Sequence, residues 1–272
     1  MIKLVALDLD DTLLNDELEI PQENIEAIDR AREHGVDVII ATGRMYCRAM
    51  PYAQELGMAP DQVMISYNGA MVRRINGDFI SHTPLEEDTA LAIIKYCQER
   101  NWTLNAYYND QLYVEKINSN VEYYMRMVGA DAHPVGDLYQ FAADGRIPLT
   151  KLLIVGDDDN FGESFEMMRS KFGASAQVTR SKKRYIEITH LEATKAKALA
   201  RLAESRGLKA DQVMVIGDGL NDLQMIQWAG IGVAMANAAS DVLAAADFVT
   251  KTNNEAGVAH AINRFISDKV TS

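Results

Sequence analysis

The sequence of 272 residues contains little cysteine and little proline, and it has no long apolar run. Its two cysteines, Cys47 and Cys97, are spaced as in no metal or redox motif, so we interpret them as ordinary thiols. The longest apolar runs are far below the roughly 20 residues of a membrane-spanning helix. Met1 leads directly into an apolar strand that ends in acids, which is not the pattern of a signal peptide. We therefore expect a soluble, cytoplasmic protein.

Basic residues are also scarce relative to acidic ones. Lysine and arginine total 27 against 39 aspartates and glutamates, which gives a net charge of −12 at pH 7. Nucleic acids and anionic membranes are bound by clustered lysine and arginine, so we expect neither as a partner. The apolar fraction of 48% is ample for a sizeable core, and the length allows one large domain or two ordinary ones. The oligomeric state is left open.

Three apolar segments, each suited to a buried strand, end in small polar or acidic residues. They are 2–7, followed by Asp8-Leu9-Asp10-Asp11-Thr12; 36–41, followed by Thr42-Gly43-Arg44; and 213–217, followed by Asp218-Gly219-Leu220-Asn221-Asp222. In parallel α/β sheets, ligand-binding and catalytic groups lie at the carboxyl ends of the strands. Alternate residues of a strand point the same way, so Asp8 and Asp10 share one small volume, and a hard cation such as Mg2+ would neutralise them. The alternative for these two residues alone is a strand followed by an Asx turn.

Strand-like and helix-like segments alternate along the chain, which predicts an α/β fold with a Rossmann-like parallel sheet. From Pro84 the composition changes, because eight of the 11 tyrosines lie between residues 84 and 185. Hairpin, helix and strand patterns are mixed there, as in a compact α+β module inserted into the α/β core. We predict a core of residues 1–83 and 186–272 and an inserted domain of residues 84–185.

Most elements can be assigned to residue ranges from periodicity and from capping or turn residues. Helices are expected at 21–34, from about 46, 86–99, 119–128, 160–171 and 194–203, and further strands at 63–66, 71–73, 78–81, 104–108, 111–115, 150–155 and 175–179. An Asn68-Gly69 turn signal follows the strand at 63–66. The acidic run at 156–160 is interpreted as a solvated turn that caps the next helix, rather than as a cation site.

Four short motifs in this order resemble those of the haloacid dehalogenase superfamily of phosphohydrolases, and most of all its Cof-type branch with a large α/β cap. The motifs are Asp8-Leu9-Asp10-Asp11-Thr12, Thr42-Gly43-Arg44, Lys195, and Gly217-Asp218-Gly219-Leu220-Asn221-Asp222. The resemblance runs from Lys3 to about Phe265. It implies that residues 1–83 and 186–272 form the catalytic core and that residues 84–185 form the cap.

The resemblance implies a Mg2+-dependent phosphatase that acts on small phosphomonoesters, with sugar phosphates as the expected substrates. Asp8 would be the nucleophile that forms an aspartyl-phosphate, which splits one hard step into two. Asp10 would be the general acid and then the general base, and its backbone carbonyl would bind the metal. The partner is accordingly a small phosphorylated metabolite.

The remaining site residues fall into three groups. The metal ligands are Asp8, Asp10 and Asp218, and the phosphate-binding residues are Leu9, Thr42, Gly43, Lys195 and Asn221. Asp222 orients Lys195 or a metal-bound water, unless it is simply a helix N-terminal acid stabilised by the dipole. Thr42 could likewise be only a helix N-cap. Arg44 is a weaker candidate for substrate contact.

One residue departs from the family pattern, because Asp11 stands where glycine is usual. Aspartate tolerates positive φ better than most residues, so we expect the turn to survive. A phosphosugar mutase or a nucleotide-cofactor phosphatase would share the same motifs, and both remain alternatives. A non-catalytic regulator that binds phosphorylated metabolites would be expected to lack Asp8, Asp10 or Lys195. Either Tyr107 or Tyr108 faces the substrate, or both pack within the cap.

Overall fold

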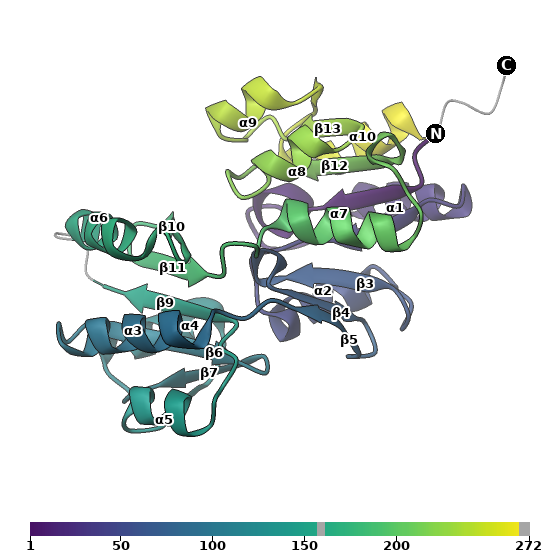
Figure 1. Cartoon of the computed structure of the whole chain (residues 1–272). Helices are drawn as coiled ribbons and strands as arrows, with labels where there is room; N and C mark the ends of the chain where they lie inside the picture. Colours follow the sequence, from purple (N-terminus) through teal and green to yellow (C-terminus); the bar gives the residue numbers. More distant parts are fainter. Residues whose placement is uncertain (157–160, 267–272) are drawn as a thin grey trace, which may run out of the picture. The chain divides into compact units, whose positions relative to one another are not determined.

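The computed structural model describes residues 1–156 and 161–266 of the chain. The chain divides into two compact units, of which unit 1 consists of Met1–Ser81 and Thr194–Ser272 and unit 2 of His82–Ala193. Figure 1 shows the elements of both. Among the described residues, no helix combines the length and the apolar character needed to cross a membrane.

Unit 1 is built on a five-stranded parallel sheet with the order β14-β13-β12-β1-β2 (Figure 1). The strands are β1 (Leu4–Leu7), β2 (Asp37–Ile40), β12 (Val213–Gly217), β13 (Ile231–Ala234) and β14 (Phe248–Val249). The first strand of the chain, β1, lies between β12 and the edge strand β2, with later strands on both sides. Leu7 at the end of β1 is in register with Ile40 of β2 and with Ile216 of β12. The carboxyl ends of these three strands therefore lie side by side.

The two faces of this sheet are both buried, and helices pack on them. Leu4 and Ala6 of β1 belong to one buried cluster together with residues of α7, α8 and α9. The helices of unit 1 are α1 (Gln22–Glu33), α2 (Tyr46–Glu55), α7 (Lys195–Ser205), α8 (Leu223–Trp228), α9 (Ser240–Ala245) and α10 (Gly257–Phe265). Because strand residues alternate between faces, Val5 and Leu7 are buried on the other side of the sheet. Helices α1 and α10 pack against each other, and α1 also contacts β2.

A small antiparallel sheet extends unit 1 beside β2. It consists of β3 (Val63–Ser66), β4 (Met71–Arg74) and β5 (Phe79–His82), and a bridge between Ala41 and Ile65 joins it to the end of β2. The turn from β3 to β4 is the short helix η2 (Tyr67–Gly69), where the sequence predicts a turn. This turn consequently lies next to the loop that follows β2.

Unit 2 is an α+β module around a six-stranded sheet with the order β10-β11-β9-β6-β7-β8. Its strands are β6 (Thr103–Tyr108), β7 (Gln111–Val114), β8 (Ala132–Pro134), β9 (Lys151–Val155), β10 (Gln177–Lys182) and β11 (Tyr185–Thr189), and its helices are α3 (Glu87–Gln98), α4 (Ser119–Val128), α5 (Leu138–Asp144) and α6 (Phe161–Phe172). Residues of α3, α5 and α6 form one buried cluster with alternate residues of β6, β9 and β11. Tyr107 is fully buried, and its hydroxyl donates to that of Tyr124 at 2.5 Å.

The predicted fold class is confirmed, but some elements and one boundary differ. The sequence-based assignment contained no element at β8 or α5, nor at the short elements after residue 222. The predicted second boundary, at residue 186, falls inside β11. This strand pairs with β9 and β10, so unit 2 extends to Ala193. The acidic turn predicted at 156–160 lies largely outside the described residues.

Candidate active site

The candidate site is formed by the loops that follow β1, β2 and β12. The Asp8 N–H donates to the Ile216 carbonyl at 3.0 Å, and the Ala41 N–H donates to that of Leu7 at 2.8 Å. These bonds continue the sheet ladder up to the first residues of the loops. From β1 the chain continues to β2 on one side of it, and it later returns to β12 on the other side. The edge at which the strand order reverses in this way is a topological switch point, where open α/β sheets bind their ligands.

Lys195 is the first residue of α7 and is completely buried between two carboxylates. Its Nζ lies 2.5 Å from Asp8 Oδ1 and 2.7 Å from Asp222 Oδ1. Burial alone would lower the pKa of Lys195, but the carboxylates of Asp222 and Asp8 raise it overall. The Thr194 hydroxyl caps α7 by accepting the Lys197 N–H at 3.0 Å. The start of α7 thus places Lys195 beside Asp8, the predicted nucleophile.

Asp222 ties the lysine to the loop after β12. Its Oδ2 accepts the N–H groups of Asp218 at 3.1 Å and Gly219 at 3.0 Å, while its Oδ1 accepts from Lys195. Asp222 is the N-cap residue of α8, but its side chain makes no capping hydrogen bond. The Asp222 carboxylate therefore contacts Lys195 and the loop after β12, and it makes no capping hydrogen bond to α8.

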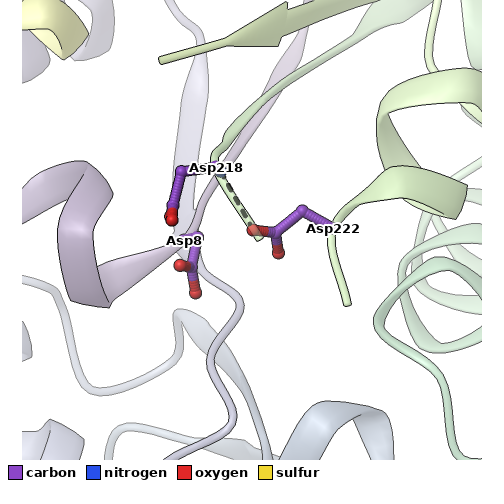
Figure 2. A group of neighbouring side chains, drawn as sticks. All are labelled: Asp8, Asp218 and Asp222. Atoms are coloured by element: carbon purple, nitrogen blue, oxygen red, sulfur yellow. Dashed lines mark hydrogen bonds between the residues drawn. The ribbon is translucent and has the colours of Figure 1, made fainter. Parts of the chain in front are cut away.

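Three carboxylates converge at this edge of the sheet. Asp8, Asp218 and Asp222 each place one oxygen within 4.8 Å of the others, and Figure 2 shows Asp8 and Asp218 side by side with Asp222 reaching toward them. The Thr12 hydroxyl donates to Asp218 Oδ1 at 2.7 Å and fixes that side chain. The predicted metal set instead included Asp10, through its backbone carbonyl.

The charge of this group is not balanced by the protein. Burial, first of all, and the nearby Asp222 and Asp11 raise the pKa of Asp218 to about 6. Burial and Asp222 likewise raise the pKa of Asp8 well above its ordinary value. Three acids face the single ammonium of Lys195. Carboxylate oxygens with excess negative charge are suitable ligands for a hard divalent cation such as Mg2+.

The carboxylate of Asp10 does not join this group but forms an ion pair with Arg44. Arg44 Nε lies 3.1 Å from Oδ1 and 2.9 Å from Oδ2, and Arg44 Nη2 lies 2.5 Å from Oδ1. The Asp10 side chain is 47% exposed, whereas that of Asp8 is 8% exposed. Asp11 has φ of +55°, so the turn retains its left-handed residue without glycine, as expected.

The predicted phosphate-binding residues lie around the same edge. Thr42 is buried, and its Oγ1 accepts the Arg44 N–H at 3.1 Å. The N-cap of α2 is Met45, so Thr42 is not a helix cap. The side chain of Leu9 is fully buried, which leaves only its backbone to contact a ligand. Asn221 Nδ2 donates to Asn68 Oδ1 at 3.0 Å.

Asn68 also lies against Gly43, where an added Cβ would be 2.9 Å from Asn68 Oδ1. Three residues in this arrangement were absent from the predicted site. Thr12 lies within the first quoted motif, Asn68 within a turn signal, and Arg44 was only a weak candidate for substrate contact. Their partners come from distant parts of the sequence, so the motifs themselves contain no signal for these contacts.

Comparisons with known proteins agree with this arrangement. A family model of haloacid dehalogenase-like hydrolases matches residues 5–262. The 5-amino-6-(5-phospho-D-ribitylamino)uracil phosphatase YcsE of Bacillus subtilis is 33% identical over 97% of this chain and 96% of its own length. The crystal structure of TM0651 from Thermotoga maritima is 32% identical, covers 97% of this chain and 98% of that one, and superposes with a TM-score of 0.88.

One further similar structure is that of a protein named for its activity. The HAD subclass IIB sugar phosphatase BT4131 is 25% identical, with a TM-score of 0.82 over 97% of this chain and 98% of its own. The chain belongs to the haloacid dehalogenase-like hydrolases. It is accordingly an enzyme of the phosphatase group within that family, and the predicted class of phosphoric monoester hydrolase is confirmed.

Proposed function

We propose that this protein is a Mg2+-dependent phosphatase that hydrolyses small phosphomonoesters, in particular sugar phosphates, through an aspartyl-phosphate on Asp8. The observation that carries the proposal is the buried ion-paired group of Asp8, Lys195 and Asp222 with Asp218 beside it. A nucleophile, a fixed cation and a cation-binding pair of acids are the groups that transfer of a phosphoryl group requires.

In the first step, Asp8 attacks phosphorus. Lys195 already holds Oδ1 of Asp8, so Oδ2 is the oxygen that forms the new bond to phosphorus. As the bond between phosphorus and the ester oxygen breaks, the leaving oxygen takes a proton from Asp10. Lys195, Thr42 and Asn221 offer donors for the anionic oxygens, whose charge must be neutralised for attack to occur.

In the second step, Asp10 takes a proton from water, and this water attacks the aspartyl-phosphate. The bond between phosphorus and Asp8 breaks, which releases inorganic phosphate and restores the carboxylate. In the resting enzyme Asp10 is paired with Arg44, because both of its carboxyl oxygens accept hydrogen bonds from the guanidinium. For the first step, Asp10 has to leave this pair and bind a proton; its side chain is half exposed and can turn.

Asp8 and Asp218, with the backbone carbonyl of Asp10, would hold Mg2+. The bound ion would supply charge neutralisation for the phosphoryl oxygens and for the two acids. Asp222 is less suited to bind the ion directly, because both of its oxygens already accept hydrogen bonds from Lys195 and from the loop after β12. Its part is to keep Lys195 beside Asp8.

The assignment of sugar phosphates rests on likeness to BT4131, which is named a sugar phosphatase. In this proposal unit 2 is the cap, and it limits the substrate to small metabolites. Likeness to YcsE, named for a uracil derivative that carries a phosphoribityl chain, favours a second candidate. That candidate is a nucleotide-cofactor precursor, which is also a small phosphomonoester and would need no change in the site of unit 1.

The proposal is tested by measuring phosphate release from a panel of sugar phosphates, nucleotides and 5-amino-6-(5-phospho-D-ribitylamino)uracil, with Mg2+ and with chelator. The wild type should hydrolyse sugar phosphates only with Mg2+. Asp8→Asn keeps the shape of the side chain but removes the attacking charge, so turnover should fall by several orders of magnitude. Near-normal turnover by a correctly folded Asp8→Asn protein would disprove the aspartyl-phosphate route.

A further inference from the structure

The turn η2 (Tyr67–Gly69) contacts three of the four segments that carry predicted phosphate-binding residues: the loop after β2, the start of α7 and the loop after β12. The Asn68 N–H donates to the Thr42 carbonyl at 3.0 Å, and the Tyr67 N–H donates to the Arg44 carbonyl at 3.0 Å. On a second side, a Cβ added to Gly69 would lie 2.3 Å from the Thr194 carbonyl oxygen, so the turn packs directly on the start of α7. On a third side, Asn68 accepts from Asn221.

The backbone of this turn is unusual. Tyr67, Asn68 and Gly69 have φ of +52°, +54° and +96°, so three consecutive residues are left-handed. Such a conformation is disfavoured for tyrosine in particular, and Tyr67 is fully buried. Backbone strain of this kind persists where the surrounding contacts enforce it, and it clusters at functional sites. The loops on either side of the turn supply those contacts.

Asn68 has a role that its backbone conformation alone does not explain. A left-handed turn position would be filled equally well by glycine. The amide of Asn68, however, lies against Gly43 and accepts one N–H of Asn221 at 3.0 Å. On the other side, the Asn221 Oδ1 lies close to Gly219, where a Cβ would be 2.5 Å away. The Asn221 amide thus donates one N–H to Asn68, while its oxygen lies against Gly219.

We infer that Asn68 is a positioning residue of the phosphate site, which acts by fixing the direction in which Asn221 donates. This inference rests on the proposed function. Asn68 would set the Asn221 amide before substrate binds, so that the donor needs no rearrangement as charge develops on the phosphoryl oxygens. A purely local role in the turn predicts that any residue tolerant of left-handed φ can replace it.

The test uses Asn68→Gly, which keeps the backbone freedom and removes only the amide. Loss of a direct donor costs roughly 10²–10³-fold in rate, so loss of its orientation should lower kcat/KM by about tenfold. Asn68→Gly should also weaken competitive inhibition by inorganic phosphate by a similar factor. The matched control is Asn101→Gly, because Asn101 has φ of +55° in an exposed turn of unit 2. It should leave both quantities unchanged.

A double-mutant cycle with Asn221→Ala separates positioning from a second direct contact. If Asn68 acts through Asn221, the double variant should be no worse than Asn221→Ala alone. The inference would be overturned if the losses of kcat/KM from the two substitutions multiply in the double variant. It would also be overturned if either Asn68→Gly or Asn221→Ala alone retains the wild-type kcat/KM. Calorimetric binding of inorganic phosphate with Mg2+ makes the same comparison without turnover. A wild type that binds phosphate but hydrolyses no ester would refute the proposed function, while the inference would still be decided by the phosphate affinities.

Discussion

Within the residues that the structure describes, each unit contains a buried lysine that is paired with an acid, and the surroundings of these two lysines differ. Lys195 in unit 1 is 0% exposed and lies 2.5 Å from Asp8 and 2.7 Å from Asp222. Lys151 in unit 2 is 4% exposed, lies 3.5 Å from Glu187 and stands 4.7 Å from the centroid of the Tyr107 ring. Burial and pairing alone therefore do not identify a catalytic group.

The difference lies in what surrounds each pair. Around Lys195, the ammonium contacts the carboxylates of Asp8 and Asp222, and a third acid, Asp218, is fixed by Thr12, so acids outnumber the ammonium in this group. Around Lys151, burial would lower the pKa of the ammonium, but Glu187 and Tyr124 raise it overall. Charge is matched there and the ring of Tyr107 covers the cation. The excess of acid in unit 1 is the feature that supports the proposed cation site.

The largest expected effect is the response to metal. Chelation should abolish hydrolysis and Mg2+ should restore it, because Asp8 and Asp218 repel each other and the phosphate without a cation. Mg2+ should also raise the Tm of the wild type, and Asp218→Asn should remove this rise. Glu187→Gln, the matched change beside the other lysine, should leave it intact. Full activity in chelator would show that unit 1 needs no metal.

The next effect is on turnover. Lys195→Met should lower kcat by roughly 10²–10³-fold, as expected for loss of a fixed group that stabilises transition-state charge. Lys151→Met should leave kcat of the folded protein within about threefold, since the proposal gives it no contact with the reacting phosphoryl group. The measurement is steady-state hydrolysis of one sugar phosphate by both variants. Equal losses of kcat in the two variants would show that Lys195 has no greater part in catalysis than Lys151.

For Lys151 in unit 2, we expect an effect on the free energy of unfolding rather than on turnover. Lys151→Met leaves the partly buried carboxylate of Glu187 without its ammonium, which should lower the free energy of unfolding by up to about 3 kcal/mol. Adding Glu187→Gln removes the uncompensated charge and should recover part of this loss. Urea unfolding of the single and double variants measures both. A double variant that is less stable than Lys151→Met would show that Glu187 contributes by contacts other than this pair.

The smallest effect is on the pH dependence of stability. In metal-free protein the pKa of Asp218 is raised from 3.8 to about 6, mainly by burial. Between these values the folded protein retains a proton that the unfolded chain has lost, so this group lowers stability as pH rises through the interval. Thermal unfolding in chelator should show a steeper fall for wild type than for Asp218→Asn.

Lys151 should act at the opposite end of the pH scale. Because its pKa is raised above 10.5, its contribution is fully present below that pH and is lost as pH rises through the folded value. Lys151→Met should therefore differ from wild type most below pH 10.5, and the difference should shrink in more alkaline solution. If the difference in stability between Lys151→Met and wild type already disappears between pH 3.8 and about 6, the titrating group is not Lys151.

Sequence reasoning located most of the elements before residue 222, whereas those after it, including the nine-residue helix α10, were not predicted. Helix α4 was predicted at 119–128, and the structure has it at Ser119–Val128. The short elements β8 and α5 were missed, because three to seven residues offer too little periodicity to read. The second unit boundary was placed too early because β11 pairs with strands that precede it in the chain. Pairing between distant strands leaves no local mark on the sequence.

For the site, the sequence by itself determined which residues stand at one edge of the sheet. Parallel strands align their carboxyl ends, so the residues after β1, β2 and β12 had to meet, and Lys195 was marked by its helix start. Only the tertiary structure decided the pairing of side chains there. Arg44 holds Asp10 across 34 residues and Asn68 meets Asn221 across 153. Such contacts depend on rotamers and on the packing of loops from separate parts of the chain, which no local pattern encodes.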